Sequence, residues 1–461
     1  MLSVLRNPSY RQLFSAQVLS LLGTGLTTVA LALLAFDLAG ADAGIVLGTA
    51  LALKMVAYVC VAPFAGALAD LLPLRTMLVA LDIARASFVL FLPFVDAVWQ
   101  IYVLVFVFQS FSAAFTPTFQ ATIPDILPDE EEYTKALSLS RLAYDLETLL
   151  SPLLAGVLLA VMSFHLLFVG TALGFLASAA LILATHLPSP EPYSDARFFD
   201  RVTRGVRIYW ATPRLKGLLA LSFAVSAAGS MVLVNTVVYA KAASGGSEED
   251  MVLLLAAFGV GSIVVALTLP RLLHAIPART AMIGGAALSA TVLAVAPFGL
   301  SSSQPIASAV PVWLLLGVGA SLVMTPSALV LRRSCHAEDR PALFAAQFAL
   351  SHACWLVAYP AAGVLGARVG IDGTFLILSA ATAASMVAAL LLWPQHDPEI
   401  IEHTHEEMEH AHAHIHDAHH SHSHETPASE PHSHRHRHAA MRHAHVFVID
   451  DHHRHWPRSG A

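Results

Sequence analysis

Long apolar segments dominate this chain, and they constrain its fold more than any other feature. A helix that crosses a bilayer needs about 20 predominantly apolar residues, and twelve such segments occur before residue 394. They lie at 12–36, 45–69, 76–95, 99–121, 141–160, 165–185, 216–240, 251–269, 280–299, 310–331, 342–366 and 371–393. Only 12% of the residues are charged, against about 25% in soluble proteins. The sequence therefore predicts an all-α polytopic membrane protein.

Internal similarity divides the twelve spans into two parallel repeats of six. The stretch "LPLRTMLVAL" at 72–81 parallels "IPARTAMIGG" at 276–285, and "SPLLAGVL" at 151–158 parallels "YPAAGVLG" at 359–366. The dipeptide Thr116-Pro117 likewise matches Thr325-Pro326. Parallel six-helix repeats occur in many secondary transporters. Four regions are expected: an N-terminal half at 1–185, a linker at 186–215, a C-terminal half at 216–394 and a tail at 395–461.

Basic residues alternate between the loops and predict the orientation of the chain. One set of loops and the N-terminus carry most of them: Arg6, Arg11, Arg75, Lys135, Arg141, Arg271, Arg279, Arg332, Arg333 and Arg340. The opposite loops hold only Lys241 and Arg368. Because basic loops stay on the cytoplasmic side, both termini and the linker are expected to face the cytoplasm of a bacterial inner membrane. The first apolar segment lacks a clear cleavage site and is expected to be retained.

The linker contains "RFFDRVTRGVRIYW" at 197–210, in which arginines recur three or four residues apart. Phe198, Val202 and Tyr209 can share another face of a helix. This pattern predicts an amphipathic helix on the anionic leaflet, with a solvated helical linker as the alternative. The isolated cysteines, Cys60, Cys335 and Cys354, indicate no disulfide framework.

Ionisable residues inside the first spans are candidates for the transport path, because charge within a membrane is costly. Lys54 lies midway along the second span and is expected either to partner a carboxylate or to take part in proton coupling. Asp82 and Arg85 stand three apart and can pair on one helix face. A structural ion pair or a gate element is favoured there over substrate contact.

Later spans add further candidates. Asp145 and Glu147 enter the fifth span and either attract cations at its inner mouth or solvate a helix start. His352 is the best single candidate for a transient metal ligand, with a satisfied core histidine as the alternative. Cys354 follows two residues later and does not share its face.

The tail is rich in histidine: 19 of the 25 histidines lie between His403 and His455. Neutral imidazole binds Ni(II), Cu(II), Zn(II) and Co(II) well, and Glu406, Glu409 and Asp417 add oxygen ligands. The candidate metal ligands are His403, His405, His410, His412, His414, His416, His419, His420, His422, His424, His432, His434, His436, His438, His443 and His445. With few apolar residues, the tail is expected to be disordered without metal. A low-complexity tail and a pH sensor are the alternatives.

The stretch "GALADLLPLRT" at 66–76 resembles the loop between the second and third helices of the major facilitator superfamily. Its matching positions are Gly66, Leu68, Asp70 and Arg75. Leu71 replaces a common basic residue and Pro73 a common glycine. The resemblance covers roughly 1–394 and implies the major facilitator fold. It also implies a cytoplasmic gate formed by Gly66, Asp70 and Arg75, with Arg279 as the counterpart in the second half. Simple helix capping is the alternative.

Two further motifs resemble those of exporters in this family. The hexapeptide "SPLLAG" at 151–156 is similar to the fifth-helix motif of antiporters: Pro152 and Gly156 match, while Ser151 and Ala155 replace glycines. Drug–proton antiporters carry an arginine in the fourth helix where this chain has Phe106, so their coupling mode is not carried over. The stretch "FTPTFQATIPDILPDEEEYTKALSL" at 115–139 resembles a branch that includes macrolide and siderophore exporters.

With its histidine-rich tail, the chain most resembles the nickel-resistance permeases. This implies proton-coupled export of nickel, and sometimes cobalt, by alternating access, with divalent metal, protons and the bilayer as partners. No permanent cofactor is expected, only transported or tail-bound Ni(II), Co(II) or Zn(II). No phosphate-binding loop or nucleophile–base arrangement occurs, so neither an enzyme nor a nucleic-acid partner is expected, and the chain is expected to act as a monomer. An exporter of drugs or metallophores with a metal-sensing tail, and a membrane-anchored metal buffer, are the alternatives.

Overall fold

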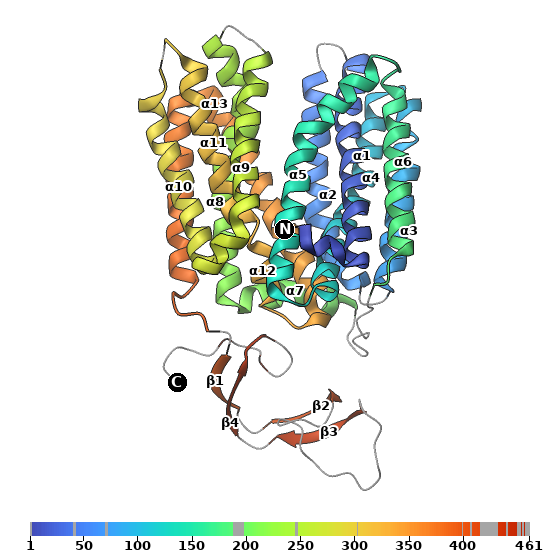
Figure 1. The fold of residues 1–461 in the computed structure, drawn as a ribbon, viewed down its shortest axis with the longest axis vertical. Helices are drawn as coiled ribbons and strands as arrows, with labels where there is room; N and C mark the ends of the chain where they lie inside the picture. Colours follow the sequence, from blue (N-terminus) through green and yellow to red (C-terminus); the bar gives the residue numbers. More distant parts are fainter. Residues whose placement is uncertain are drawn as a thin grey trace. The chain divides into compact units, whose positions relative to one another are not determined.

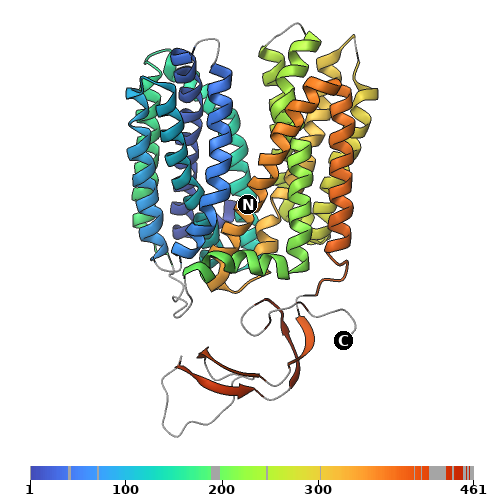
Figure 2. The ribbon, with the colours of Figure 1, turned by 180° about the vertical axis from the view of Figure 1, so that it is seen from behind.

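The computed structural model describes most of the chain in two compact units, Met1–Gln395 and His396–Ala461. The described residues are 2–39, 43–69, 72–187, 198–244, 248–301, 303–398, 400–405, 408–414, 432–438, 441–449, 453 and 456. The first unit is a helical bundle in two halves (Figures 1 and 2). The second unit holds the described part of the tail.

Six long helices form the N-terminal half. After the short η1 (Leu2–Arg6) come α1 (Pro8–Ala39), α2 (Ala43–Ala69), α3 (Leu74–Val89) with η3 (Leu92–Phe94), α4 (Val98–Ile126), α5 (Glu130–Leu159) and α6 (His165–Ala184). Their positions agree with the first six predicted spans. The helix α5 begins earlier than expected, because the Asp129 carboxylate accepts a hydrogen bond from the Glu132 amide at 2.9 Å and caps the helix.

The linker helix α7 (Phe198–Ala211) leads into the C-terminal half. That half contains α8 (Pro213–Ser244), α9 (Glu248–Ala275), α10 (Ala278–Gly299), α11 (Pro305–Met324), α12 (Ser327–Arg332), η4 (Ala337–Asp339) and α13 (Arg340–Leu392). Within α13 the backbone leaves the helical region at Gly370, with φ 73° and ψ 177°. Glycine adopts a positive φ more readily than other residues, so the helix can break at this position. The break lies between the last two predicted spans, 342–366 and 371–393.

Length and composition agree with a membrane-spanning bundle. Among the described residues, nine helices are long and apolar enough to cross a membrane, with α13 counted once across its break. The helix α2 adds a shorter apolar stretch at 49–65. The helix α5 is not among the nine, and it carries an acidic first turn and further charges along its length. When α2, α5 and the two parts of α13 on either side of Gly370 are counted as separate spans, the described helices give the expected arrangement of six spans in each half.

Close backbone contact holds neighbouring helices together. A Cβ added at Gly317 of α11 would lie 1.9 Å from the carbonyl oxygen of Phe258 in α9, and one at Gly261 would lie 2.0 Å from that of Leu314. Any larger side chain would force the two helices apart. Small residues therefore set the approach of α9 and α11, as is typical between helices in lipid.

The linker helix α7 forms as predicted, but it packs on protein where the sequence suggested the bilayer surface. The Arg204 side chain forms an ion pair with Asp339, just before α13, and the hydroxyl of buried Tyr209 donates to Oε1 of Gln347. Gly205 lies so close to α13 that an added Cβ would be 2.0 Å from the carbonyl oxygen of Ala342. The apolar side of α7 is thus covered by α13. Arg197 and the Arg201 side chain lie outside the described residues.

Part of the tail has regular structure. Four short strands are present: β1 (Ile400–His405), β2 (Met408–His414), β3 (His432–His438) and β4 (Met441–Val446). The strands pair antiparallel as β1 with β4 and β2 with β3. Alternating residue types in these segments have the two-residue period of a strand. Because isolated two-stranded ladders are marginal in water, disorder of the metal-free tail stays a prediction.

Candidate functional site

Ion pairs join the two halves at one end of the bundle. Asp125, near the end of α4, pairs with Arg340 at the start of α13, and Glu130 at the start of α5 pairs with Arg333 after α12. The side chains of Asp125 and Arg340 are each 15% exposed, whereas Glu130 is 50% exposed. Water screens the exposed pair more strongly, so the Asp125–Arg340 pair contributes more to the junction.

Apolar and backbone contacts complete this junction. Buried Leu329 of α12 belongs to the same apolar cluster as Phe119 and Tyr133 of the N-terminal half. The Tyr133 hydroxyl donates to the carbonyl oxygen of Ala328 at 3.4 Å, and Arg332 donates to that of Pro128. Because residues of both halves share one core here, the halves are closed at this end.

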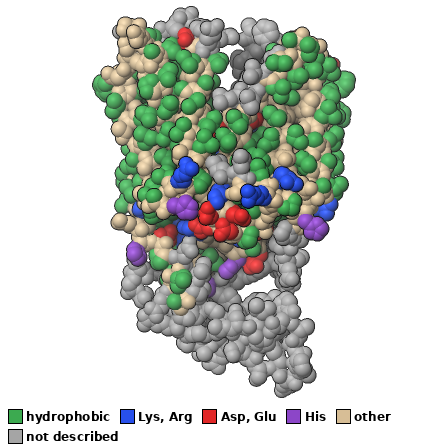
Figure 3. All heavy atoms as spheres, in the orientation of Figure 1, with side chains coloured by type: hydrophobic (Ala, Val, Ile, Leu, Met, Phe, Trp, Pro, Cys, Tyr) green, Lys and Arg blue, Asp and Glu red, His purple; other side chains and the backbone are tan. Residues whose placement is uncertain are grey.

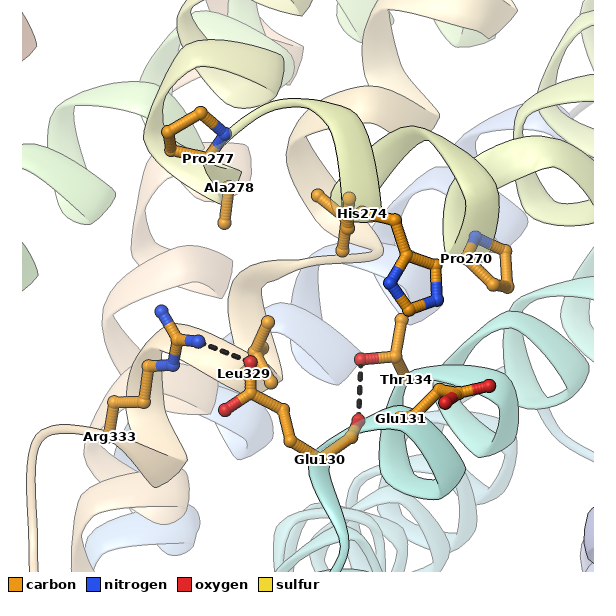
Figure 4. A pocket seen from close by; sticks show the side chains of 10 residues that line it. Glu130, Glu131, Thr134, Pro270, His274, Pro277, Ala278, Leu329 and Arg333 are labelled. Atoms are coloured by element: carbon orange, nitrogen blue, oxygen red, sulfur yellow. Dashed lines mark hydrogen bonds and ion pairs between the residues drawn. The ribbon is translucent and has the colours of Figure 1, made fainter.

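A pocket of about 280 Å³ lies at the same junction (Figure 4). Its lining comes from both halves: Glu130, Glu131, Thr134, Pro270, Leu273, His274, Pro277, Ala278, Leu329 and Arg333. Figure 3 shows acidic, basic and histidine side chains gathered in a band at this end, next to a largely apolar surface. We call this region the charged end. Figures 1 and 2 show the two halves diverging toward the opposite end.

The helices α5 and α9 are linked by Arg141. Its guanidinium donates to the Ser262 hydroxyl at 2.8 and 3.0 Å, and it also pairs with Asp145 at 3.0 Å within α5. Asp145 is therefore neutralised by an arginine that contacts the other half. Glu147 lies at the contact of α5 with α1, where its Oε1 would be 3.0 Å from a Cβ added at Gly25.

A second cluster lies between the halves, midway along the spans, and we call it the central cluster. The Tyr58 ring of α2 lies 5.4 Å from the Lys54 ammonium and 4.8 Å from the His352 ring of α13. The Tyr58 hydroxyl donates to Gln109 Oε1 of α4 at 3.1 Å, and Phe348 packs against both Tyr58 and His352. All five side chains are half-buried. The two residues that the sequence singled out separately, Lys54 and His352, thus lie against one tyrosine.

The predicted ion pair of Asp82 and Arg85 forms within α3, and both side chains are buried. The Arg85 guanidinium stacks 3.9 Å from the Phe115 ring of α4 and 4.4 Å from the Phe175 ring of α6. These partners all belong to the N-terminal half. The pair therefore stabilises the packing of α3 and does not belong to the junction of the halves.

The repeat-related arginines hold equivalent helix ends. Arg75 donates to the carbonyl oxygen of Leu183, at the end of α6, and Arg279 donates to that of Trp393, after α13, at 2.8 and 3.1 Å. Terminal carbonyl groups of a helix lack intrahelical partners, and each arginine satisfies one. Asp70 lies outside the described residues, and the surroundings of Gly66 are not described.

The antiporter-like motif lies where α5 meets α1. A Cβ added at Gly25 of α1 would come within 1.9 Å of the Ser151 hydroxyl oxygen. Ser151 is buried, while the side chains of Pro152 and Gly156 lie outside the described residues. The small residues at this position therefore allow two helices to approach closely.

No group of three or more His, Cys, Asp or Glu side chains that could hold a metal occurs among the described residues. Cys354, two residues after His352, is buried. The tail histidines at 416, 419, 420, 422 and 424 lie outside the described residues. For the other tail ligand candidates the structure describes the backbone of the strands.

Twelve spans in two six-helix halves, closed at one end by contacts between halves, define a membrane transporter and not an enzyme. The chain matches the Major Facilitator Superfamily over residues 13–310 and 219–416 and belongs to that family. An uncharacterised MFS-type transporter of Bacillus subtilis, YfiS, is 32% identical over 120 residues. That match spans 26% of this chain and only 28% of the relative.

Solved structures share the fold at low sequence identity. The human organic anion transporter MFSD10 superposes with a TM-score of 0.71 at 14% identity, covering 83% of this chain and 99% of that one. A bacterial homologue of the iron transporter ferroportin, outward-facing, gives 0.67 at 16% identity, with 83% and 98% covered. The Escherichia coli fucose:proton symporter FucP gives 0.64 at 15% identity, with 84% and 98% covered. These likenesses establish the fold alone.

Proposed function

We propose that this transporter exports a divalent transition metal, nickel first and cobalt second, from the cytoplasm in exchange for protons. The observation that carries the proposal is the histidine-rich tail, which holds 19 of the 25 histidines and directly follows the last span. Imidazole is the side chain best suited to these borderline ions. A tail of this composition on a transporter can gather its substrate.

The side of the membrane follows from charge. The charged end carries Arg332, Arg333 and Arg340 as well as the linker helix α7, and basic loops stay on the cytoplasmic side. The helix α13 ends at Leu392, and Arg279 of the same end donates to the carbonyl oxygen of Trp393, which supports a tail on the cytoplasmic side. Contact of the halves at this end, with divergence at the other, then corresponds to an outward-facing state.

The central cluster offers a coupling mechanism. His352 serves as a transient ligand for the ion, and Lys54 lies against the same tyrosine. A divalent ion at His352 and a charged Lys54 would place two positive charges against the same tyrosine, and like charges repel each other strongly where water is partly excluded. Metal binding therefore favours the neutral lysine, and reprotonation favours metal release. Exclusive occupation by metal or proton gives antiport.

An organic exporter is the second candidate, and the aromatic residues of the central region favour it. The Trp355 and Tyr359 rings lie 5.0 Å apart on the helix that carries His352, and Lys54 supplies a positive charge. Apolar rings with one fixed charge suit an organic anion. MFSD10, described as an organic anion transporter, shares the fold. A metal carried as an anionic metallophore complex would satisfy both the cluster and the tail.

The test compares metal content in cells with and without the protein, loaded with Ni, Co, Zn, Cu or Cd. Lower nickel in expressing cells, restored to control levels when the proton gradient is collapsed, supports the proposal. The matched control is His352→Ala, with its amount in the membrane verified, which should leave nickel content high. Unchanged content of every metal, together with efflux of an organic anion, would replace metal export by the second candidate.

A further inference from the structure

One register runs through both ladders of the tail. In the outer ladder Ile400 stands opposite Val446, and in the inner ladder His414 stands opposite His432. Both ladders therefore follow the same pairing rule, and we call β1 with β2 one arm of the tail and β3 with β4 the other. The register therefore decides which histidines face each other across the arms.

In the inner ladder three successive histidine pairs stand directly opposite each other. They are His410 with His436, His412 with His434, and His414 with His432. Ladder positions two apart lie on the same face, so the three pairs share a face. Opposite residues have Cα atoms about 4.5–5.5 Å apart, and consecutive pairs on a face follow at about 7 Å. The outer ladder adds one such pair, His403 with His443.

The other face of the inner ladder carries no histidine. There Glu409 stands opposite Arg437, Ala411 opposite Arg435, and Ala413 opposite Ser433. A shift of the register by one residue would exchange the two faces of one strand and place histidine opposite alanine, serine, glutamate or arginine. Histidine pairs can form only if the alternate histidines of β2 stand opposite the alternate histidines of β3. The observed register meets this condition.

We propose that the paired face of β2 and β3 is a metal-binding ladder in which one divalent transition-metal ion is held between opposite histidines. The proposal rests on the proposed function for the role of the tail, and it assigns the ligands by pair. Two consecutive pairs present four imidazoles, a set that suits Ni(II), Cu(II) and Zn(II) and not Mg(II) or Ca(II), which take oxygen ligands.

Metal binding and strand pairing are then one event. A two-stranded ladder alone is marginally stable, so the free energy of metal binding becomes free energy of folding. The tail arms separate when the ion leaves and pair when it binds. A flexible tail without strand pairing would behave differently, because its affinity for metal would depend on the number of histidines and not on their order in the sequence.

Phase can be changed at constant composition, which separates the two possibilities. The quadruple variant S433H, H434S, H436R and R437H reorders 432–438 from HSHRHRH to HHSRRHH and keeps every residue type in number. In the new order no two histidines of 432–438 stand two positions apart. Whatever the register, this segment therefore cannot pair histidines with both His410 and His412, or with both His412 and His414. Purified full-length protein is titrated with Ni(II) alone by calorimetry, with Mg(II) as the negative control, and amide exchange of 408–414 and 432–438 is followed.

Wild-type protein should bind Ni(II) and show slowed exchange in both strands, with no response to Mg(II). The reordered variant should lose roughly tenfold or more in affinity, because ligands no longer placed together lose effective concentration, and should gain no protection. Equal affinity and protection in the two proteins would overturn the ladder. Cellular nickel export by the wild type is scored separately: its absence would overturn the proposed function while the binding data still decide on the ladder.

Discussion

Arg340 at the start of α13 forms an ion pair with Asp125 near the end of α4, across 215 positions of sequence. One residue belongs to each half, and both are largely buried among the contacts that close the charged end. Under the proposed export by alternating access, these contacts break when the transporter turns inward. We therefore propose this pair as an element of the gate, and the gating role that the sequence motif implied for Asp70 and Arg75 stays a prediction.

Asp125→Asn should destabilise the closed charged end. Loss of a hydrogen-bonded charge pair costs about 1.5–3 kcal/mol, which shifts the population roughly 10- to 150-fold toward the inward-open state. Distances between spin labels on α5 and α9 report that population. The exchanged pair Asp125→Arg with Arg340→Asp is the control and should restore closure. An unchanged distance distribution in the single variant would remove this pair from the gate.

Cys335, which follows α12 in the same region, should report the gate chemically. Its side chain is buried, and burial raises the pKa of the thiol above its ordinary value. Alkylation requires the thiolate, so the wild type should react slowly at pH 7 and faster as the pH rises. In a Cys60→Ala background, Asp125→Asn should accelerate the reaction. Equal rates with and without the gate pair would contradict opening at this site.

Gly205→Val should disrupt the seat of α7 on α13. The Cβ atom of the new side chain would already lie 2.0 Å from the carbonyl oxygen of Ala342. Overpacking of this kind costs about 1–3 kcal/mol of stability. Thermal unfolding in detergent measures the loss. The matched control is Gly284→Val in α10, where the new Cβ faces open space. A helix that rests on lipid instead would tolerate both changes.

Asp82→Ala should destabilise the N-terminal half by about 3–5 kcal/mol, because it leaves the Arg85 guanidinium buried without its partner. Thermal unfolding in detergent is again the measurement. The double variant Asp82→Leu with Arg85→Met removes both charges and should recover most of the stability and the export activity. If the double variant folded well but exported nothing, the pair would belong to the transport cycle.

Lys54→Arg should uncouple export from the proton gradient. Arginine keeps a positive charge but does not release its proton in proteins, so the exclusive exchange proposed at the central cluster cannot turn over. Metal-driven proton release in proteoliposomes is the measurement, and Lys54→Gln, which fixes the neutral form, is the companion variant. Retained pH-driven transport in Lys54→Arg would assign coupling to another group.

Much of the candidate site was predictable, and the reason differs from residue to residue. Lys54, Asp82 and His352 stand out because charged or titratable groups inside apolar spans are rare. Asp125 and Arg340 were missed, since each lies at the boundary of a span where charge is ordinary. A signal was present: the loop after Thr116-Pro117 is acidic, "DILPDEEE", and the repeat-related loop after Thr325-Pro326 is basic, "RRSCHAEDR". Opposite charges at equivalent positions of two repeats indicate a contact between them.

The sequence by itself determined the twelve spans, their division into two halves and the concentration of histidine in the tail. Apolar length and repetition express these features locally, and a bilayer leaves a chain of such segments little choice but helices. Tertiary structure alone decided that Lys54 and His352 meet at Tyr58, that Asp125 pairs with Arg340, and that α7 lies on α13. Such contacts join residues far apart in the chain, and their partners are selected by packing, which no local pattern records.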